Sequence, residues 1–96
     1  MNSYDFASEE HIKKEKAKVK PAKKSAWWAR KCALGLCHYC QQKFPFKELT
    51  MDHIVPLARG GTTTPGNTVP ACRECNKKKG VDTPFDIFLK NSSSNT

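Results

Sequence analysis

The stretch TMDHIVPLARGGTTTPGNTVPACRECNKKKG, residues 50–80, decides the fold of this 96-residue chain. An Asp-His pair, Asp52 and His53, lies in an apolar run that is followed by a loop rich in glycine, threonine and proline. Asn67 precedes a second short apolar run, after which a Cys-x-x-Cys pair opens a basic segment. This order predicts a strand, a loop, a short returning strand and a helix.

A second Cys-x-x-Cys pair lies upstream, with 31 residues between the two pairs. A chain this short buries little apolar surface, so an additional stabilising link is expected. Its five cysteines allow two disulfides and a free thiol, or a metal site in a reducing compartment. The paired spacing favours a structural tetrahedral zinc ion. The expected ligands are Cys37, Cys40, Cys72 and Cys75.

Two residues near the first pair are not expected to bind zinc. Trp28 and Cys32 lie at helical spacing on a core-facing stripe, which predicts a buried thiol at Cys32. His38 stands between the two cysteines of a tight turn and is expected to point outward.

The composition divides the chain into three expected segments. Residues 1–24 turn lysine-rich and hold few apolar side chains, so they are expected to add little to any core. They are interpreted as a basic N-terminal arm, either a disordered solubilising leader or a DNA-contacting arm. Residues 25–90 are expected to form the zinc-stabilised domain, whose last helix docks on the core, and residues 91–96 a disordered tail.

The formal net charge of +8 favours a polyanionic partner, of which nucleic acid is the commonest inside cells. No apolar segment has the length of a membrane span, and the polar N-terminus does not have the pattern of a signal peptide. A cytoplasmic protein without a membrane partner is therefore expected.

The apolar alternation of residues 49–55 predicts a half-buried strand. Consecutive strand side chains point to opposite faces, so Asp52 and His53 can serve one site only if the strand ends, bulges or twists there. Pro56 supports such an ending.

These motifs together resemble the HNH endonuclease family. The resemblance implies an α+β architecture, the small ββα-metal (His-Me finger) fold, here with a four-cysteine zinc site and flanking helices. Many family members end the motif in a second histidine, whereas this chain has Asn76, which makes it an H-N-N variant. The HNH domain of RNA-guided CRISPR effector nucleases is similar in this respect, and its Asp-His-Ile-Val-Pro run looks like residues 52–56.

The candidate chemistry is metal-dependent hydrolysis of DNA phosphodiester bonds. His53 titrates near neutral pH and is the candidate general base, the role that the resemblance also implies. Asp52 and Asn76 offer oxygen ligands that suit Mg²⁺ or Mn²⁺. By resemblance, Asn67 steadies the loop and the histidine through hydrogen bonds, and the substrate is double-stranded DNA.

Candidate nucleic-acid contacts are basic. Arg59 is expected to clamp a phosphate or to stabilise charge in the transition state. The others lie on the helix expected after Cys72, where Glu74 and Lys78 have the spacing of an ordinary ion pair instead. The full candidate set is Arg59, Arg73, Lys77, Lys78 and Lys79. The alternative function is a noncatalytic zinc module that binds nucleic acid or a protein. The motifs do not encode the oligomeric state.

Overall fold

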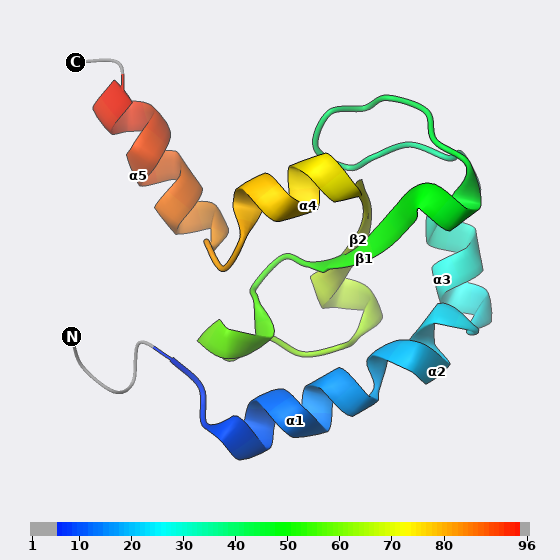
Figure 1. Ribbon diagram of the computed structural model, residues 1–96, viewed down its shortest axis with the longest axis horizontal. Coiled ribbons are helices and arrows are strands. Elements are labelled where there is room, and N and C mark those ends of the chain that lie inside the picture. Colours follow the sequence, from blue (N-terminus) through cyan, green and yellow to red (C-terminus); the bar gives the residue numbers. More distant parts are fainter. Residues whose placement is uncertain (1–5, 95–96) are drawn as a thin grey trace.

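A β-hairpin followed by a helix forms the centre of the computed structural model, which describes residues 6–94 (Figure 1). Helices precede and follow this unit. In chain order the elements are α1 (Glu9–Ala17), α2 (Val19–Lys23), α3 (Ala26–Lys31), η2 (Phe46–Glu48), β1 (Leu49–His53), η3 (Leu57–Arg59), η4 (Pro65–Asn67), β2 (Thr68–Cys72), α4 (Arg73–Lys79) and α5 (Pro84–Ser94), the η elements being 3₁₀ turns. The expected α+β class and the ββα order of β1, β2 and α4 are confirmed.

The two strands pair antiparallel, from Leu49 opposite Cys72 to His53 opposite Thr68. Every residue of β2 is buried. Strand β1 pairs along one edge of β2, and the first Cys-x-x-Cys turn approaches the other, where the His38 N–H donates to the Pro70 carbonyl at 2.8 Å. Strand β1 is shorter than the expected run of residues 49–55, because it ends at His53.

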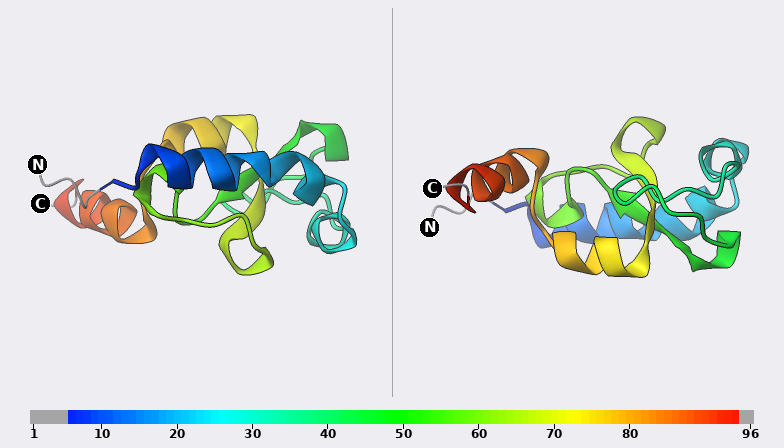
Figure 2. Two further views of the ribbon diagram at one scale, coloured as in Figure 1. Left: turned by 90° about the horizontal axis from the view of Figure 1, so that it is seen from below. Right: turned by 90° about the horizontal axis from the view of Figure 1, so that it is seen from above.

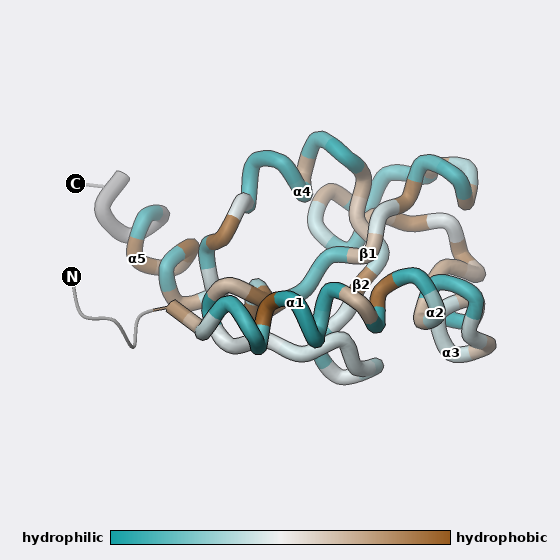
Figure 3. The backbone as a smooth tube through the Cα atoms, turned by 60° about the horizontal axis from the view of Figure 1, so that its bottom comes forward, coloured by the Kyte–Doolittle hydropathy of each residue, from teal (hydrophilic) through white to brown (hydrophobic). Residues whose placement is uncertain are grey.

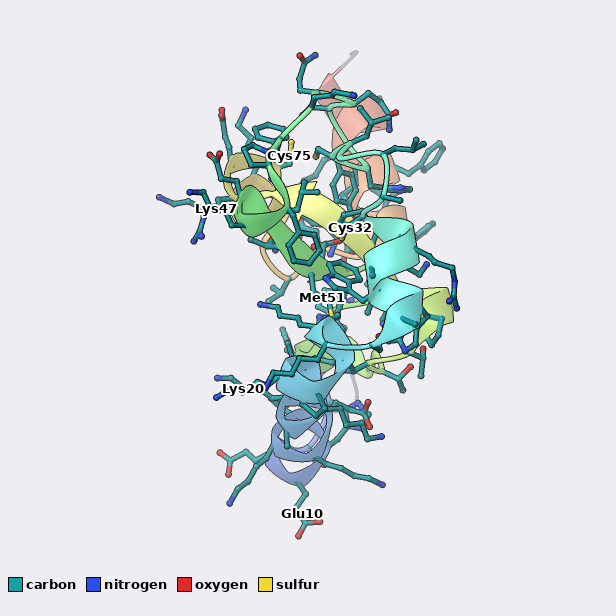
Figure 4. The ribbon with its side chains drawn as sticks, turned by 90° about the vertical axis from the view of Figure 1, so that its right-hand side faces the viewer. Glu10, Lys20, Cys32, Lys47, Met51 and Cys75 are labelled. Carbon is teal, nitrogen blue, oxygen red and sulfur yellow. The ribbon has the colours of Figure 1, made fainter. Side chains whose placement is uncertain are left out.

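The hydrophobic core lies between α3 and the hairpin. Trp28 is 2% exposed and packs with Cys32, Leu49 and Met51, which confirms the predicted stripe and the buried thiol. Figure 4 shows Cys32 and Met51 in this interior. Ser25 begins α3 by accepting a hydrogen bond from the Trp28 N–H at 3.2 Å, because its hydroxyl satisfies an amide that the first helical turn leaves unpaired.

The N-terminal segment is helical and packed, so the expectation that it adds little to the core is wrong. Val19 and Ala22 of α2 contact the core cluster, and Glu15 of α1 is 3% exposed. Figure 1 shows α1 running below the hairpin while α4 runs above it. The lysine-rich composition did not indicate this packing, because the buried residue of α1 is Glu15, a charged residue whose partners lie within the protein. Residues 1–5 lie outside the described part.

Helix α5 begins as expected but does not dock. Thr83 and Asp86 exchange cap hydrogen bonds at 2.9–3.2 Å. Phe85 and Phe88 are 66% and 63% exposed, so the expectation that this helix docks on the core is wrong. The helix continues through Ser94, into the expected tail, whose last two residues lie outside the described range.

The molecule is flat, with extents of 38 × 37 × 18 Å, and α5 projects from one end (Figure 2). Along the tube of Figure 3, α4 is mostly hydrophilic, while α5 carries several hydrophobic segments. Among the described residues, no helix combines the length and the apolar character that crossing a membrane requires.

Candidate active site

Four cysteines converge where the first Cys-x-x-Cys turn meets the start of α4. Their sulfur atoms all lie within 4.8 Å of one another, and each thiol is free of disulfide bonds. Local structure positions them, because the sulfur of Cys72 also caps α4 by accepting the Cys75 N–H at 3.5 Å. The four residues are Cys37, Cys40, Cys72 and Cys75, as the spacing predicts. Cys32 is not among them, and His38 is exposed, as expected.

This cluster fits a structural zinc ion. Tetrahedral zinc with bonds of about 2.3 Å to sulfur requires sulfur separations of about 3.8 Å, which these side chains reach with a small contraction. Burial opposes ionisation of Cys37, but the backbone N–H groups of Cys40, Cys72 and Tyr39 lower its pKa to about 6. Burial and the neighbouring sulfurs raise the pKa of Cys75 to about 12. Without a metal, Cys37 therefore ionises readily while Cys75 resists ionisation. A bound dication would stabilise all four cysteines as thiolates.

Asp52 lies on the face of β1 that packs against α4. It is 2% exposed; the Tyr39 hydroxyl donates to its Oδ2, and Lys79 Nζ lies 3.5 Å from its Oδ1. Burial and the Asp52 carboxylate raise the pKa of Tyr39 well above its ordinary value, so the phenol remains a donor. A buried carboxylate needs such partners because it has lost its water.

Asn76 lies on the same face of β1 as Asp52. Its Nδ2 donates to Thr50 Oγ1 at 2.8 Å, and Thr50 is two residues before Asp52 in the strand. Side chains two residues apart in a strand share a face, so the structure brings the two candidate metal ligands to one side of the hairpin. The amide nitrogen is used by Thr50, which leaves the amide oxygen as the donor atom for a hard cation.

The location of Lys79 differs from the expected one. It was expected on the DNA-contacting surface but is 7% exposed, with Nζ donating to the His53 carbonyl at 2.7 Å and lying beside Asp52. The ammonium compensates the buried carboxylate and ties the end of α4 to the end of β1. A residue this buried is part of the site's framework rather than a surface contact.

His53 lies on the opposite face of β1, toward α1. Its Nε2 is 3.0 Å from Thr63 Oγ1, and the Thr63 hydroxyl donates its one proton to the Glu15 carbonyl at 2.8 Å. The hydroxyl can therefore only accept from the imidazole, so Nε2 carries the hydrogen and Nδ1 holds the lone pair. Burial lowers the pKa of His53 below its ordinary 6.5; Asp52 opposes this and Lys79 reinforces it. This lowering favours the neutral imidazole over its protonated form.

Thr63 is held in turn by α1. Its backbone N–H donates to Glu15 Oε1 at 2.8 Å, while Glu15 Oε2 pairs with Lys18 at 2.7 Å. The hydrogen bonds from Lys18 and Thr63 lower the pKa of Glu15, which keeps it ionised. Helix α1 is thus linked to His53 through Thr63, whose hydroxyl donates to the Glu15 carbonyl and accepts from His53 Nε2.

Asn67 joins the two ends of the loop that follows β1. Its Oδ1 accepts the Val55 N–H at 2.9 Å, and its Nδ2 donates to the carbonyls of Val55 and Thr62 at 3.0 and 2.8 Å. Gly61 allows this approach, because a Cβ there would lie 1.7 Å from the Val55 carbonyl oxygen. Asn67 contacts the loop and not the imidazole.

The remaining basic candidates divide by exposure. Arg59 is paired with Asp86 at 2.8 Å and lies 5.5 Å from the Phe6 ring centre, so its charge is matched and not free for a phosphate. Lys78 forms the expected i,i+4 pair with Glu74 at 3.4 Å on an exposed surface. Arg73 and Lys77 are exposed on α4.

Three site residues were not anticipated from the sequence: Tyr39, Thr63 and Glu15. Tyr39 stands inside a Cys-x-x-Cys turn, and that position beside a zinc ligand was the available signal. Thr63 is one of three consecutive threonines, and Glu15 lies 48 residues away from it. No local pattern connects these two.

Comparisons with known proteins identify relatives of this chain. A family model described as HNH endonuclease matches residues 37–88. The CRISPR-associated endonuclease Cas9 of Corynebacterium diphtheriae is 48% identical over 58 residues, covering 59% of this chain and 5% of that protein. Cas9 of Actinomyces naeslundii is 36% identical over 55 residues, covering 56% of this chain and again 5% of the relative. The family model spans more than half of the chain, which therefore belongs to the HNH endonuclease family.

Proposed function

We propose that this chain is a metal-dependent endonuclease that hydrolyses DNA phosphodiester bonds. The observation that carries the proposal is the end of β1, where a neutral imidazole with Nδ1 available adjoins a buried carboxylate oriented by Tyr39. A noncatalytic zinc module that binds nucleic acid or a protein is the alternative. Simple binding requires neither a histidine held in one tautomer nor a buried carboxylate beside it.

His53 acts as the general base in this proposal. Nδ1 takes a proton from the attacking water, the water oxygen bonds to phosphorus, and the bond to the 3′ oxygen breaks. The leaving 3′ oxygen takes a proton from solvent water, and the Nδ1 proton is later released to solvent. The products carry 5′-phosphate and 3′-hydroxyl ends. The Nε2–H group continues to donate to Thr63 Oγ1, which holds the ring in place while the proton moves at Nδ1.

Asp52 and Asn76 are the proposed ligands of the catalytic ion. One carboxylate and one amide oxygen on a single strand face fit Mg²⁺ or Mn²⁺, which prefer oxygen ligands and retain water. When bound, such an ion stabilises the negative charge that develops on the phosphate and the leaving oxygen. Asn67 is proposed to hold the loop that positions His53.

Double-stranded DNA is the proposed substrate. Both relatives are named as endonucleases, and the chain carries a formal charge of +8. A reducing compartment such as the cytoplasm is the proposed location, because four thiols there bind zinc without forming disulfides.

A plasmid-cleavage assay with Mg²⁺, Mn²⁺ or EDTA tests the proposal. We expect His53→Ala to lower turnover by about 100- to 10,000-fold, the usual contribution of a general base. Asp52→Ala is also expected to abolish cleavage, but high Mn²⁺ should partly restore it because the lost group is a metal ligand. Leu34→Ala is the control, since this exposed side chain lies outside the zinc cluster and outside the contacts of Asp52 and His53 and should leave cleavage unchanged.

The contrast between the variants decides the outcome. Full cleavage by both the His53 and the Asp52 variants would assign the activity to a contaminant or another site. The noncatalytic zinc module would then be the better account of this chain.

A further inference from the structure

An open groove of about 460 Å³ lies between the N-terminal helices and the end of β1. It is distinct from the zinc cluster, and it reaches the end of β1 at His53, the residue next to Asp52. The residues that line it are Lys16, Val19, Lys20, Lys23, His53 and Leu57. The candidate base therefore opens onto a groove whose other charged side chains are all lysines.

The three lysines form one row. Lys16, Lys20 and Lys23 follow the i, i+4, i+7 spacing of a helix face, although α1 and α2 meet between them. All three are exposed, and none takes part in the ion pairs found among residues 6–90. Figure 4 shows Lys20 projecting outward from its helix. The neighbouring acid, Glu15, is already paired with Lys18 and does not neutralise the row.

The size of the row matches a nucleic-acid strand. Seven helical residues rise about 10 Å, which corresponds to about three nucleotides of one DNA strand at 3.4 Å each. Val19 and Leu57 supply an apolar floor between the charges, suited to sugar rings. We propose that this groove binds the sugar–phosphate backbone of the DNA strand that is cut, with Lys16, Lys20 and Lys23 contacting phosphates beside His53.

This inference rests on the proposed function and gives α1 and α2 a role in it. Thr63 is hydrogen-bonded to Nε2 of the imidazole, whereas the groove opens onto another part of the His53 side chain. A strand lying in the groove brings its phosphates to His53 without any displacement of the hydrogen bonds that hold the ring.

The test measures DNA binding against salt concentration, without cleavage, in a His53→Ala background. The variant Lys16→Gln/Lys20→Gln/Lys23→Gln should reduce the log–log salt slope by about 2 to 3, since each phosphate contact contributes about 0.9. The matched control is Lys13→Gln/Lys14→Gln/Lys24→Gln, which removes the same charge from exposed positions of the same segment outside the groove. The control should keep a slope close to that of the parent, and both variants should keep the parent melting temperature.

Two results would overturn the inference: equal slopes for the groove variant and the parent, or equal losses in the groove variant and the control. Its failure is distinguishable from failure of the nuclease function. A chain that cuts plasmid but shows no groove effect loses only this inference. A chain that shows the groove effect but cuts nothing in any metal loses only the proposed reaction.

Discussion

The two faces of strand β1 differ in what supports them. On one face, Asp52 is held by Tyr39 from the first Cys-x-x-Cys turn and by Lys79 from α4, both of which depend on the zinc cluster. On the other face, the His53 imidazole is held by Thr63 and, through it, by α1, while Lys79 contacts only the His53 backbone carbonyl. The proposed metal ligand and the proposed base are adjacent in sequence, yet different parts of the chain position them.

This difference shows that the zinc cluster alone does not position the candidate catalytic residues. The zinc cluster organises α4 and therefore the Asp52 face, while the His53 face depends on a helix that begins 44 residues earlier at Glu9. Substitutions of the residues that hold Asp52 should therefore change the metal dependence of cleavage. Substitutions of the residues that hold His53 should change the turnover.

The largest expected effect comes from removing a zinc ligand. Cys72→Ser should lose both zinc and fold, because structural zinc contributes about 10–16 kcal/mol of binding free energy, comparable to the whole stability of a small domain. Zinc content and circular dichroism measure this. Cys32→Ser is the control and should retain the metal, since Cys32 lies outside the cluster. Two disulfides in protein purified from the cytoplasm would contradict the zinc assignment.

A smaller effect is expected from the support of Asp52. Tyr39→Phe removes the hydroxyl that donates to the carboxylate while keeping the ring, and groups that orient a metal ligand typically contribute 10- to 100-fold. The Mg²⁺ concentration needed for half-maximal cleavage should rise by about that factor, with structural zinc unchanged. A metal titration that coincides with that of the parent would show that Tyr39 does not orient a ligand.

The smallest effect is expected on the other face. Thr63→Val removes the hydroxyl that accepts from Nε2 and donates to the Glu15 carbonyl. Only the first of these hydrogen bonds involves the imidazole, and losing its contribution of about 0.5–1.5 kcal/mol should lower turnover about 2- to 10-fold. Thr63→Ser should restore it, because the hydroxyl returns. Unlike Tyr39→Phe, this change should leave the Mg²⁺ dependence unaltered, and nitrogen NMR shifts of His53 should show that Thr63→Val loses the preference for Nε2–H. A metal-dependence shift equal to that of Tyr39→Phe would show that the two faces are not supported separately.

Much of the fold was readable from local patterns. The Cys-x-x-Cys spacings identified all four members of the cluster, and Asp52, His53 and Asn67 flank the loop between the two strands. These features were predictable because ligand turns, strand alternation and loop glycines act over a few residues. The position of Asn67 at the loop closure was anticipated, although it bonds to Val55 and Thr62 and not to the imidazole.

What only the tertiary structure decided involves charged residues and distant partners. Composition suggested that Lys79 is a surface residue and that residues 1–24 add little to the core, yet Lys79 and Glu15 are both buried against partners far along the chain. Burial of a charge depends on whether another element supplies a compensating group, and no local spacing encodes that. The sequence by itself thus determined the zinc cluster and the ββα order, while the tertiary structure decided which side chains hold Asp52 and His53 in place.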